Sequence, residues 1–389
     1  MTPSLVIDNI GLLISNDPEI GERRDVSIVF EHERVTAVLP AGSTAAVADS
    51  RIDAGGRCLI PGFVDSHTHL VFAGDRGDEF AARMAGAPYA AGGIRVTTAA
   101  TRATSTAELV ALAQARRDAA YACGITHMEI KSGYGLDVET EARLCAAAAE
   151  FTDDVTFLGA HVVPSEFAYE PDAYVDLVCG PMLEACAARA RWIDVFCETG
   201  AFDYPQSRRV LEAGRAAGLG LRVHGNQLGH GPGVQLAVEL DAASVDHCTY
   251  LSDGDVDALA SSQTVATLLP ATDFSTRQPY PDARRLLDAG VAVALATNCN
   301  PGSSYTSAMA FCIALAVRDM QMTVSEALSA ATLGGARALR RTDIGHLGLG
   351  ARADAVLLDA PSPTHLVYRP GMPLTAKTLS RGALVFSAE

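Results

Sequence analysis

Two histidines, His67 and His69, are separated by a single residue in the run CLIPGFVDSHTHLVFAGDR. The apolar stretch before them, residues 59–64, predicts a buried strand. Because alternate side chains of a strand share a face, both imidazoles point to one side, where a single metal ion can bind both. A bare His-x-His pair is a weak signal, but further histidines follow later predicted strands. The pattern therefore predicts a metal site.

Polar side chains gather at the ends of nearly all the predicted strands. They are His67, His69, Glu129, Lys131, Tyr134, His161, Glu198, His224, Asn226, Gln227, Asp246, His247, Asn298, Asn300 and Ser303. One such histidine is typical of a satisfied core position, whereas five at four strand ends indicate a site. The chemistry that fits is hydrolysis, since a bound divalent ion lowers the pKa of water to about 7. His247 could hold the hydroxide or move a proton.

Lys131 admits two interpretations. A lysine at a strand end can be carbamylated and bridge a second metal ion. Its setting in KSGYG favours a one-metal site in which Lys131 is a structural cation.

Eight predicted strands position these groups. They start near Leu59, His127, Val155, Trp192, Leu219, Ala243, Thr264 and Val291. Helical patterns lie between most of them, at residues 106–123, 138–151, 172–190, 206–218, 233–240, 254–261 and 281–290. Eight alternating strands and helices predict an α/β chain with a (β/α)8 TIM barrel, which presents active-site groups at the C-terminal strand ends. A doubly wound open sheet is the alternative, but no Gly-x-Gly-x-x-Gly follows the first strand.

Both ends of the chain predict β-structure. Residues 1–57 hold short alternating runs split by Asp, Pro and Gly, and residues 340–389 include strand-like segments at 354–359 and 378–386. We expect 1–57 and 340–389 to form one small β-domain around a barrel at 58–339.

Composition and net charge limit the classes of binding partner that we expect for this chain. The formal net charge of −16 disfavours nucleic acid and anionic membranes. No apolar run reaches the roughly 18 residues of a membrane span. The nine cysteines form no Cys-x-x-Cys pair, and the N-terminus lacks a basic region before an apolar stretch. We expect a cytoplasmic protein, a homodimer, that takes a small molecule as substrate.

Several motifs together carry a resemblance to a known family. PGFVDSHTH, a histidine on each of the fifth and sixth strands, and GARADAVLLD resemble the amidohydrolase superfamily. HTHLVFAGDRGDEF, GGI followed by TTAATR, EIKSGYGL, TFLGAHVVP, DVFCETGAF and CNPGS resemble the imidazolonepropionases within it. The resemblance spans roughly residues 55–340. It implies hydrolysis of 4-imidazolone-5-propanoate to N-formimidoyl-L-glutamate in histidine degradation.

The resemblance also implies roles for individual residues. One zinc or iron ion would be held by His67, His69 and His224, with the position of Asn298 as a further ligand. His247 would lie beside the water on the metal. Arg76 would bind the substrate's carboxylate, since a guanidinium pairs with it in a bidentate manner. The other substrate-contacting positions are Tyr89, Tyr134, His161, Gln227, Asn300, Gly302 and Ser303.

Two positions depart from the family's pattern. Gln227 stands where the family usually has an acid, a candidate proton carrier, and HGNQ could be a subgroup form of that motif. Asn298 stands where the family usually has a metal-binding Asp. An amide cannot act as a base and is a poorer ligand for a dication. Asn298 could be an engineered substitution or a natural change, and either would impair the enzyme.

Two alternatives stay open at this point. One is another member of the superfamily, a deaminase of a cyclic base or a hydrolase of another cyclic amide. Arg76 and Tyr89 discriminate against it, because a neutral base needs no guanidinium. The other is a non-catalytic ligand-binding relative, which Asn298 and Gln227 favour and the otherwise intact set of polar strand ends disfavours.

Overall fold

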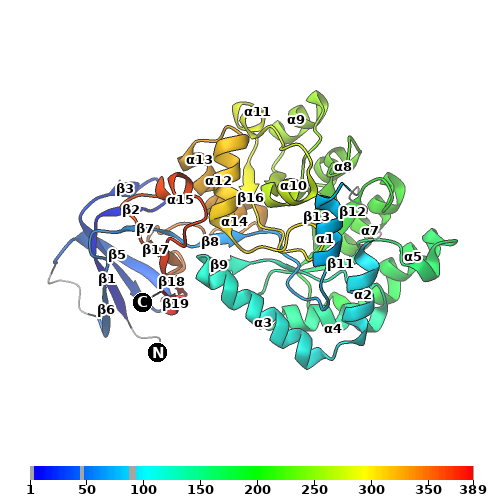
Figure 1. Ribbon diagram of the computed structural model, residues 1–389, viewed down its shortest axis with the longest axis horizontal. Coiled ribbons are helices and arrows are strands. Elements are labelled where there is room, and N and C mark those ends of the chain that lie inside the picture. The colour runs from blue at the N-terminus through cyan, green and yellow to red at the C-terminus, as the bar shows by residue number, and fades with distance from the viewer. Residues whose placement is uncertain (1–3, 44–47, 87–92, 389) are drawn as a thin grey trace. The chain divides into compact units, whose positions relative to one another are not determined.

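The structure, a computed structural model, describes residues 4–43, 48–86 and 93–388 (Figure 1). The chain folds into two compact units, each assembled from separate segments. One holds Met1–Asp65, Asp118–His127 and Ser307–Glu389, and the other holds Ser66–Arg117 and Met128–Thr306. The predicted domain boundaries near residues 57 and 340 stay a prediction.

A curled sheet of seven strands forms the centre of the second unit. In order across the sheet these are β10 (Ile130–Lys131), β11 (Val155–Ala160), β12 (Trp192–Cys197), β13 (Gly220–Gly225), β14 (Ser244–His247), β15 (Val265–Leu268) and β16 (Val293–Leu295). Every neighbouring pair is parallel. The strands are almost wholly buried, as expected for a parallel sheet covered on both faces.

The segment that carries the His-x-His pair joins the two edges of this sheet. Thr68 bridges Asn298 in parallel fashion, and the amide of Asn298 donates to the carbonyl of His67 over 3.0 Å. On the other side, the amide of Lys131 donates to the carbonyl of Thr68 over 2.9 Å. The sheet therefore closes as a TIM-like barrel, which confirms the predicted fold class.

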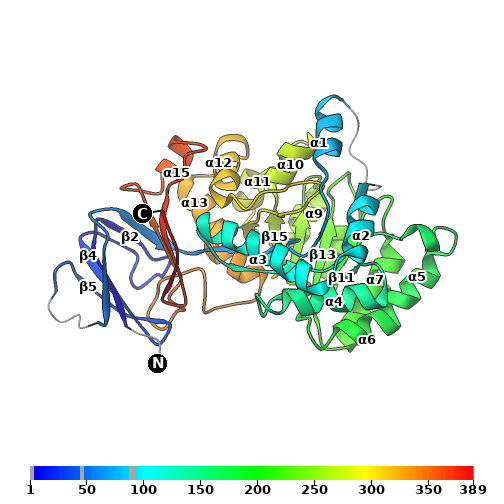
Figure 2. The same cartoon turned by 60° about the horizontal axis from the view of Figure 1, so that its bottom comes forward.

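Helices follow most of these strands and lie outside the sheet (Figure 2). The second unit contains α1 (Gly77–Met84), α2 (Ile94–Ala103), the first part of α3 (Thr106–Ala122), α4 (Val138–Ala148), η2 (Ser165–Phe167), α5 (Pro171–Leu177), η3 (Val178–Met182), α6 (Leu183–Cys186), α7 (Tyr204–Ala216), α8 (Gly233–Glu239), α9 (Asp253–Ala260), α10 (Pro270–Thr276) and α11 (Ala283–Asp288). Capping fixes several starts: the carboxylate of Asp137 accepts from Thr140 N over 2.8 Å at α4, and Asp203 forms a capping box at α7.

The single helix predicted over residues 172–190 is wrong. It is broken into α5, η3 and α6, because Gly180 leaves the helical region (φ −111°, ψ −106°) and Pro181 has no amide hydrogen to donate.

In the first unit, strands from both chain ends share a sheet. Six strands run in the order β19 (Ala383–Ser387), β18 (Thr375–Ser380), β17 (Ala355–Leu358), β7 (Cys58–Pro61), β2 (Leu12–Ile14) and β3 (Glu22–Arg23). A second sheet contains β5 (Arg34–Pro40), β4 (Val26–Glu31), β1 (Leu5–Ile10) and β6 (Ser50–Asp53). Ile7, Ile28, Leu59 and Leu357 belong to one buried cluster. The expected β-structure built from both ends is confirmed.

Two predicted strands of this unit are each two strands. Residues 59–64 divide into β7, in the six-stranded sheet, and β8 (Phe63–Asp65), which pairs with β9 (Ile125–Met128). The break falls at Gly62, where a Cβ would lie 2.1 Å from Thr126 Oγ1. Likewise β18 and β19 are separated by Arg381 and Gly382, both with positive φ, which form a two-residue hairpin turn.

Four further helices and one short helical segment complete the unit: α12 (Met309–Asp319), α13 (Val324–Ser329), η4 (Ala330–Gly334), α14 (Gly335–Ala338) and α15 (His365–Tyr368). Within the described parts of the chain, no helix has the length and apolar character needed to cross a membrane.

Candidate active site

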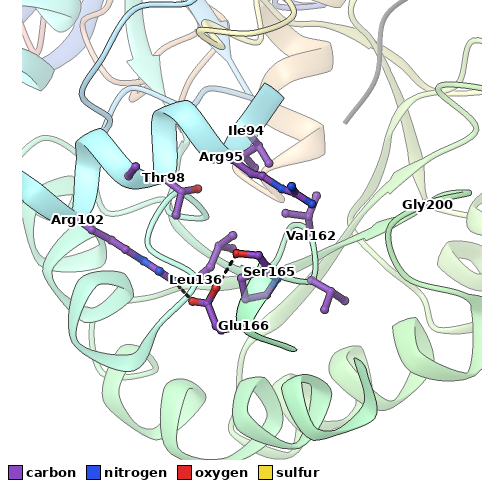
Figure 3. Close-up of a pocket in the computed structure, with 12 residues that line it drawn as sticks. Ile94, Arg95, Thr98, Arg102, Leu136, Val162, Ser165, Glu166 and Gly200 are labelled. Carbon is purple, nitrogen blue, oxygen red and sulfur yellow. Dashed lines mark hydrogen bonds and ion pairs between the residues drawn. The ribbon is translucent and has the colours of Figure 1, made fainter. Parts of the chain in front are cut away.

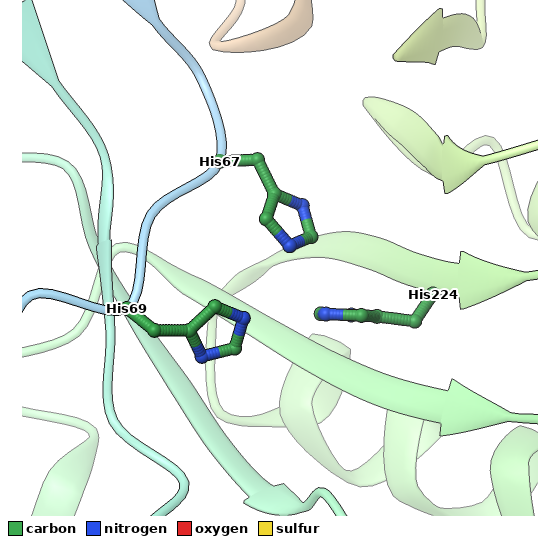
Figure 4. A group of neighbouring side chains, drawn as sticks. All are labelled: His67, His69 and His224. Atoms are coloured by element: carbon green, nitrogen blue, oxygen red, sulfur yellow. The ribbon is translucent and has the colours of Figure 1, made fainter. Parts of the chain in front are cut away.

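Three buried imidazoles converge at the C-terminal end of the barrel sheet (Figure 4). His67 and His69 follow β8, and His224 lies in β13. One nitrogen from each of the three rings lies within 4.8 Å of the other two. Burial lowers the pKa of His67 and of His69 well below the usual range, so both rings are neutral and keep a lone pair for a metal. Neither Nε2 atom has a hydrogen-bond partner among the described residues.

Asn298 contributes a fourth group. Its amide nitrogen donates to Thr272 Oγ1 over 2.8 Å and to Ser303 Oγ over 2.9 Å. Its amide oxygen is buried, with no hydrogen-bond partner in the described part of the chain. The convergent imidazoles of His67, His69 and His224 and one orphaned oxygen fit a cation and leave room for a further ligand.

Two carboxylates orient the imidazoles of His67 and His224 through their Nδ1 atoms. His67 Nδ1 lies 2.7 Å from Asp246 Oδ2, and His224 Nδ1 lies 2.9 Å from Asp194 Oδ2. A carboxylate at Nδ1 fixes the tautomer that leaves Nε2 as the metal-binding atom. His224 lies between these acids in register, because β13 pairs with both β12 and β14.

A fully buried ionic network lies beneath these contacts. Lys131 Nζ lies 2.9 Å from Glu129 Oε1 and 2.8 Å from Asp194 Oδ2, and Arg222 Nη2 lies 3.0 Å from Asp246 Oδ2. Three carboxylates and two cations give a formal charge of −1. Burial alone would raise the pKa of Asp194, but His224 and Lys131 outweigh it and hold that pKa below its usual range. The prediction that Lys131 is a structural cation agrees with these ion pairs.

His247 stands on a strained turn beside the metal-binding rings. Its ring centroid lies 5.6 Å from that of His67 and 5.3 Å from that of His224. His247 and Cys248 both have positive φ, 86° and 53°, which is uncommon for side chains other than Gly or Asn. Burial lowers the pKa of His247 well below its usual range, so the ring is neutral and can accept a hydrogen bond.

Contacts on both sides hold this turn. Asn226 Nδ2 donates to the carbonyl of Tyr250 over 2.9 Å. From α10, the carboxyl of Asp273 accepts from Thr249 Oγ1 over 2.9 Å. Burial raises the pKa of Asp273 to about 8, with the bond from Thr249 opposing part of the rise. Asp273 is therefore mostly protonated at neutral pH.

The predicted substrate-contacting residues form a second group around the same centre. His161 stacks on His69 at a centroid distance of 5.4 Å, and Tyr134 lies 5.4 Å from His161. His161 Nδ1 lies 2.9 Å from the carbonyl of Gly133, and burial lowers the pKa of His161 to about 3. The ring is neutral, so Nδ1 carries the hydrogen and Nε2 is an acceptor.

Arg76 lies at the outer end of this group and is buried. Its guanidinium packs against Gly302, and the amide of Gly302 donates to Asn300 Oδ1 over 2.8 Å. Next along the loop, Ser303 accepts from Asn298. The loop at residues 300–303 thus connects Arg76 with the metal-binding end of the site.

Gln227 is buried in the loop after β13. Its backbone amide and that of Leu228 donate to the carboxylate of Glu198 over 2.9 and 3.0 Å. Of the predicted site residues, Tyr89 lies outside the described residues. The others have the contacts given above, and their roles stay predictions.

Five residues at the site have no role in the predictions from sequence: the half-buried Glu79 and the buried Asp194, Arg222, Thr272 and Asp273. Asp194 and Arg222 carried a signal, because each is a charged residue inside an apolar strand, WIDVFC and GLRVHG. Glu79 and Asp273 lie on helices, α1 and α10, that the sequence does not predict, so the contacts of their carboxylates are not expected from it.

A cavity of about 380 Å³ opens next to this group, between α2 and the loop after β11 (Figure 3). Leu136 and Val162 line it, two residues after Tyr134 and one after His161. Its polar side chains include Arg95, Arg102 and Glu166. Arg102 pairs with Glu166 over 2.8 Å.

Comparisons with known proteins decide the family. A profile of the Amidohydrolase family matches residues 58–385. The chain is 60% identical to an imidazolonepropionase of Mycolicibacterium smegmatis over 99% of this chain and 98% of that protein. It is also 60% identical to an imidazolonepropionase of Streptomyces coelicolor, over 98% and 99%. The chain belongs to the amidohydrolase family, and within it to the imidazolonepropionases.

Solved structures show the same amidohydrolase fold at much lower identity. A 5-methylcytosine deaminase from Klebsiella pneumoniae has a TM-score of 0.77 at 15% identity, over 99% of this chain and 98% of that one. An adenosine deaminase from Xanthomonas campestris, solved with bound zinc, has a TM-score of 0.72 at 17% identity, over 98% and 92%. These likenesses support the barrel fold.

Proposed function

We propose that this site hydrolyses 4-imidazolone-5-propanoate to N-formimidoyl-L-glutamate with one metal ion held by His67, His69 and His224. The observation that carries the proposal is the joining of two groups at one barrel end, three convergent imidazoles and a buried arginine. The imidazolonepropionase relatives at 60% identity supply the reaction.

In this reaction the ring bond between the carbonyl carbon and its amide nitrogen breaks. The carbonyl carbon takes the water oxygen and becomes a carboxylate that stays bonded to the neighbouring ring carbon, and the nitrogen leaves the carbonyl carbon and takes a proton. The product therefore carries two carboxylates where the substrate carried one.

We propose zinc as the ion, with iron as the other candidate. Three imidazoles and an open position are typical of catalytic zinc. A divalent ion in such a site lowers the pKa of bound water and polarises the carbonyl under attack.

The side chains divide the remaining work. Arg76 binds the propanoate carboxylate. Neutral His161 and Tyr134 flank the ring, and the loop from Asn300 to Ser303 holds the far side. His247 accepts a hydrogen bond from the attacking water. Because Gln227 and Asn298 carry no acid, His247 is the nearest group of the set that can take a proton.

Neither alternative is favoured over this reaction. In a deaminase that acts on a neutral base, Arg76 would have no substrate carboxylate to bind. A purely ligand-binding protein has no need of orienting carboxylates behind two metal-binding imidazoles.

The test uses two substrates. The chain should hydrolyse 4-imidazolone-5-propanoate, followed by loss of imidazolone absorbance and by mass spectrometry of the product. A 5-methyl analogue without the carboxylate should react far more slowly with the chain, and Arg76→Ala should remove most of that preference. Release of ammonia, or equal rates on both compounds, would contradict the proposal.

Two further predictions about the whole protein stay proposals, a homodimer and a cytoplasmic location. All nine cysteines lie in the described part of the chain and none is in a disulfide, as a reducing compartment requires. Light scattering of the purified chain tests the dimer.

A further inference from the structure

We propose that Glu79 is a positioning residue, which holds the guanidinium of Arg76 in the orientation that receives the substrate's carboxylate. The inference rests on the proposed function, because it needs Arg76 to bind that carboxylate. Glu79 lies one helical turn from Arg76 on α1.

The contact uses one defined edge of the guanidinium. Arg76 Nε donates to Glu79 Oε2 over 2.8 Å, and Nη2 donates to Glu79 Oε1 over 2.8 Å. This bidentate pair fixes the plane of the guanidinium as well as its position. It turns the Nη1 end toward Gly302, in the loop predicted to hold the substrate.

Two glycines leave space for the pair. A Cβ at Gly93 would lie 2.1 Å from Glu79 Oε2 and 2.3 Å from Arg76 Nη2, and a Cβ at Gly302 would lie 2.0 Å from Arg76 Nη1. Gly93 has φ −64° and ψ −19°, a conformation open to any residue. Gly93 is therefore needed for space and not for its backbone freedom. This gives the second glycine of the GGI motif a physical reason.

A second arginine ties the pair to its surroundings. Arg83 Nη2 donates to the carbonyl of Gly302 over 2.7 Å, and Nη1 donates to the carbonyl of Ser275 over 3.0 Å. Arg83 also lies 3.4 Å from Glu79. Glu79 thus joins two buried guanidiniums on α1 to the loop after β16. Two arginines and one glutamate leave one positive charge at the end of the site where an anion is to bind.

A double-mutant cycle tests the inference. Glu79→Gln keeps the size and shape of the side chain but weakens both charge-assisted bonds. In the chain as written, Glu79→Gln should lower kcat/KM for 4-imidazolone-5-propanoate about tenfold, mostly through KM, because the arginine is no longer preorganised. In an Arg76→Ala background the same change should cost less than about twofold, since the residue it positions is gone.

Three controls separate positioning from a general effect on structure or charge. Metal content should match in all variants. Asp78→Asn removes an exposed negative charge one residue away on α1 and should leave KM unchanged. Gly93→Ala keeps every charge but displaces the pair, and should raise KM as Glu79→Gln does.

The outcomes are distinguishable. If Glu79→Gln lowers kcat/KM equally in both backgrounds, the role of Glu79 is overturned and the proposed function stays intact. The same holds if Glu79→Gln has no effect in either background while Arg76→Ala still raises KM. If Arg76→Ala itself leaves KM unchanged, the proposed carboxylate site fails, and the inference fails with it.

Discussion

The two ends of the active site are built differently. The proposed metal side, formed by His67, His69, His224 and Asn298, lies on or directly after barrel strands and rests on a buried ionic network. The proposed carboxylate side, formed by Arg76, Glu79 and Gly302, lies on a helix start and a loop. An ion pair between two glycines and the hydrogen bonds of Arg83 stabilise it. Under the proposed function, strands fix the reacting centre while loops and short helices select the substrate, as is usual for a TIM barrel.

The largest expected effect is on the metal side. The double variant His67→Ala/His69→Ala removes two of three imidazole ligands. It should bind no stoichiometric metal and lose at least about 10³-fold in kcat/KM, because a metal ion supplies several kcal/mol of charge stabilisation. Elemental analysis and rate measurement check this, with exposed His230→Gln as the matched control. A fully occupied site in the double variant would show that the ion lies elsewhere.

Asn298→Asp is expected to raise activity on the proposed metal side. An aspartate in this pocket would add a negative charge beside the cation and could accept the proton of the attacking water. General-base help is typically worth about 10²–10⁴-fold, so the Asp form should be faster by that order at matched metal content. Equal rates of the two forms would place the base elsewhere, with His247 the first residue to substitute.

Asp194→Asn tests the support beneath the metal side. Without this carboxylate, His224 loses its orienting partner, and metal affinity should fall about 10–100-fold. Chelator competition measures it. Glu129→Gln, which removes a carboxylate from the same network without touching a ligand imidazole, should cause a smaller fall. Equal falls would mean that only the summed charge matters.

A smaller effect concerns stability and pH at the strained turn of His247. The pKa of Asp273 is about 8 in the folded chain against an ordinary value of 3.8, so between these values the folded state binds the extra proton. Its contribution to stability is present at low pH and is lost as pH rises toward 8. Through Asp273, the free energy of unfolding of the chain should fall by about 1 kcal/mol for each pH unit between these two pKa values. Asp273→Asn should abolish this fall. Denaturant unfolding at pH 5, 7 and 9 checks it; parallel pH profiles of the two proteins would contradict it.

The smallest effect is expected at the cavity beside α2. Arg95 is exposed there, and an anionic substrate approaches a chain whose net charge is −16. Arg95→Gln should lower kcat/KM about two- to threefold at low ionic strength, with the difference vanishing in high salt. Arg95→Lys serves as the control that keeps the charge. A salt-independent loss would show that Arg95 contacts the substrate directly.

The difference between the strand-borne and the loop-borne side of the site also determines which site residues the sequence predicts. The metal-side residues follow apolar runs, so strand periodicity and the His-x-His spacing predicted their convergence. The prediction of one strand over residues 59–64 is wrong. The strand is divided at Gly62, where the chain approaches Thr126 closely, and this tertiary contact has no local sequence signal.

The carboxylate side was reached only through the resemblance. The role of Arg76 follows from the resemblance alone. Glu79 receives no role from the sequence, because the eight residues of α1 are too few for a clear helical period. Asp273 is hidden for a similar reason: its burial depends on how α10 packs over the turn of His247, which no local pattern encodes.

Metal titration of the chelator-treated chain shows how many ions the activity requires. With zinc added in steps and hydrolysis of 4-imidazolone-5-propanoate followed, the rate should rise linearly and stop at one equivalent per chain, with His67→Ala/His69→Ala flat throughout. A break at two equivalents, or full activity in the metal-free chain, would contradict a single ion held by His67, His69 and His224.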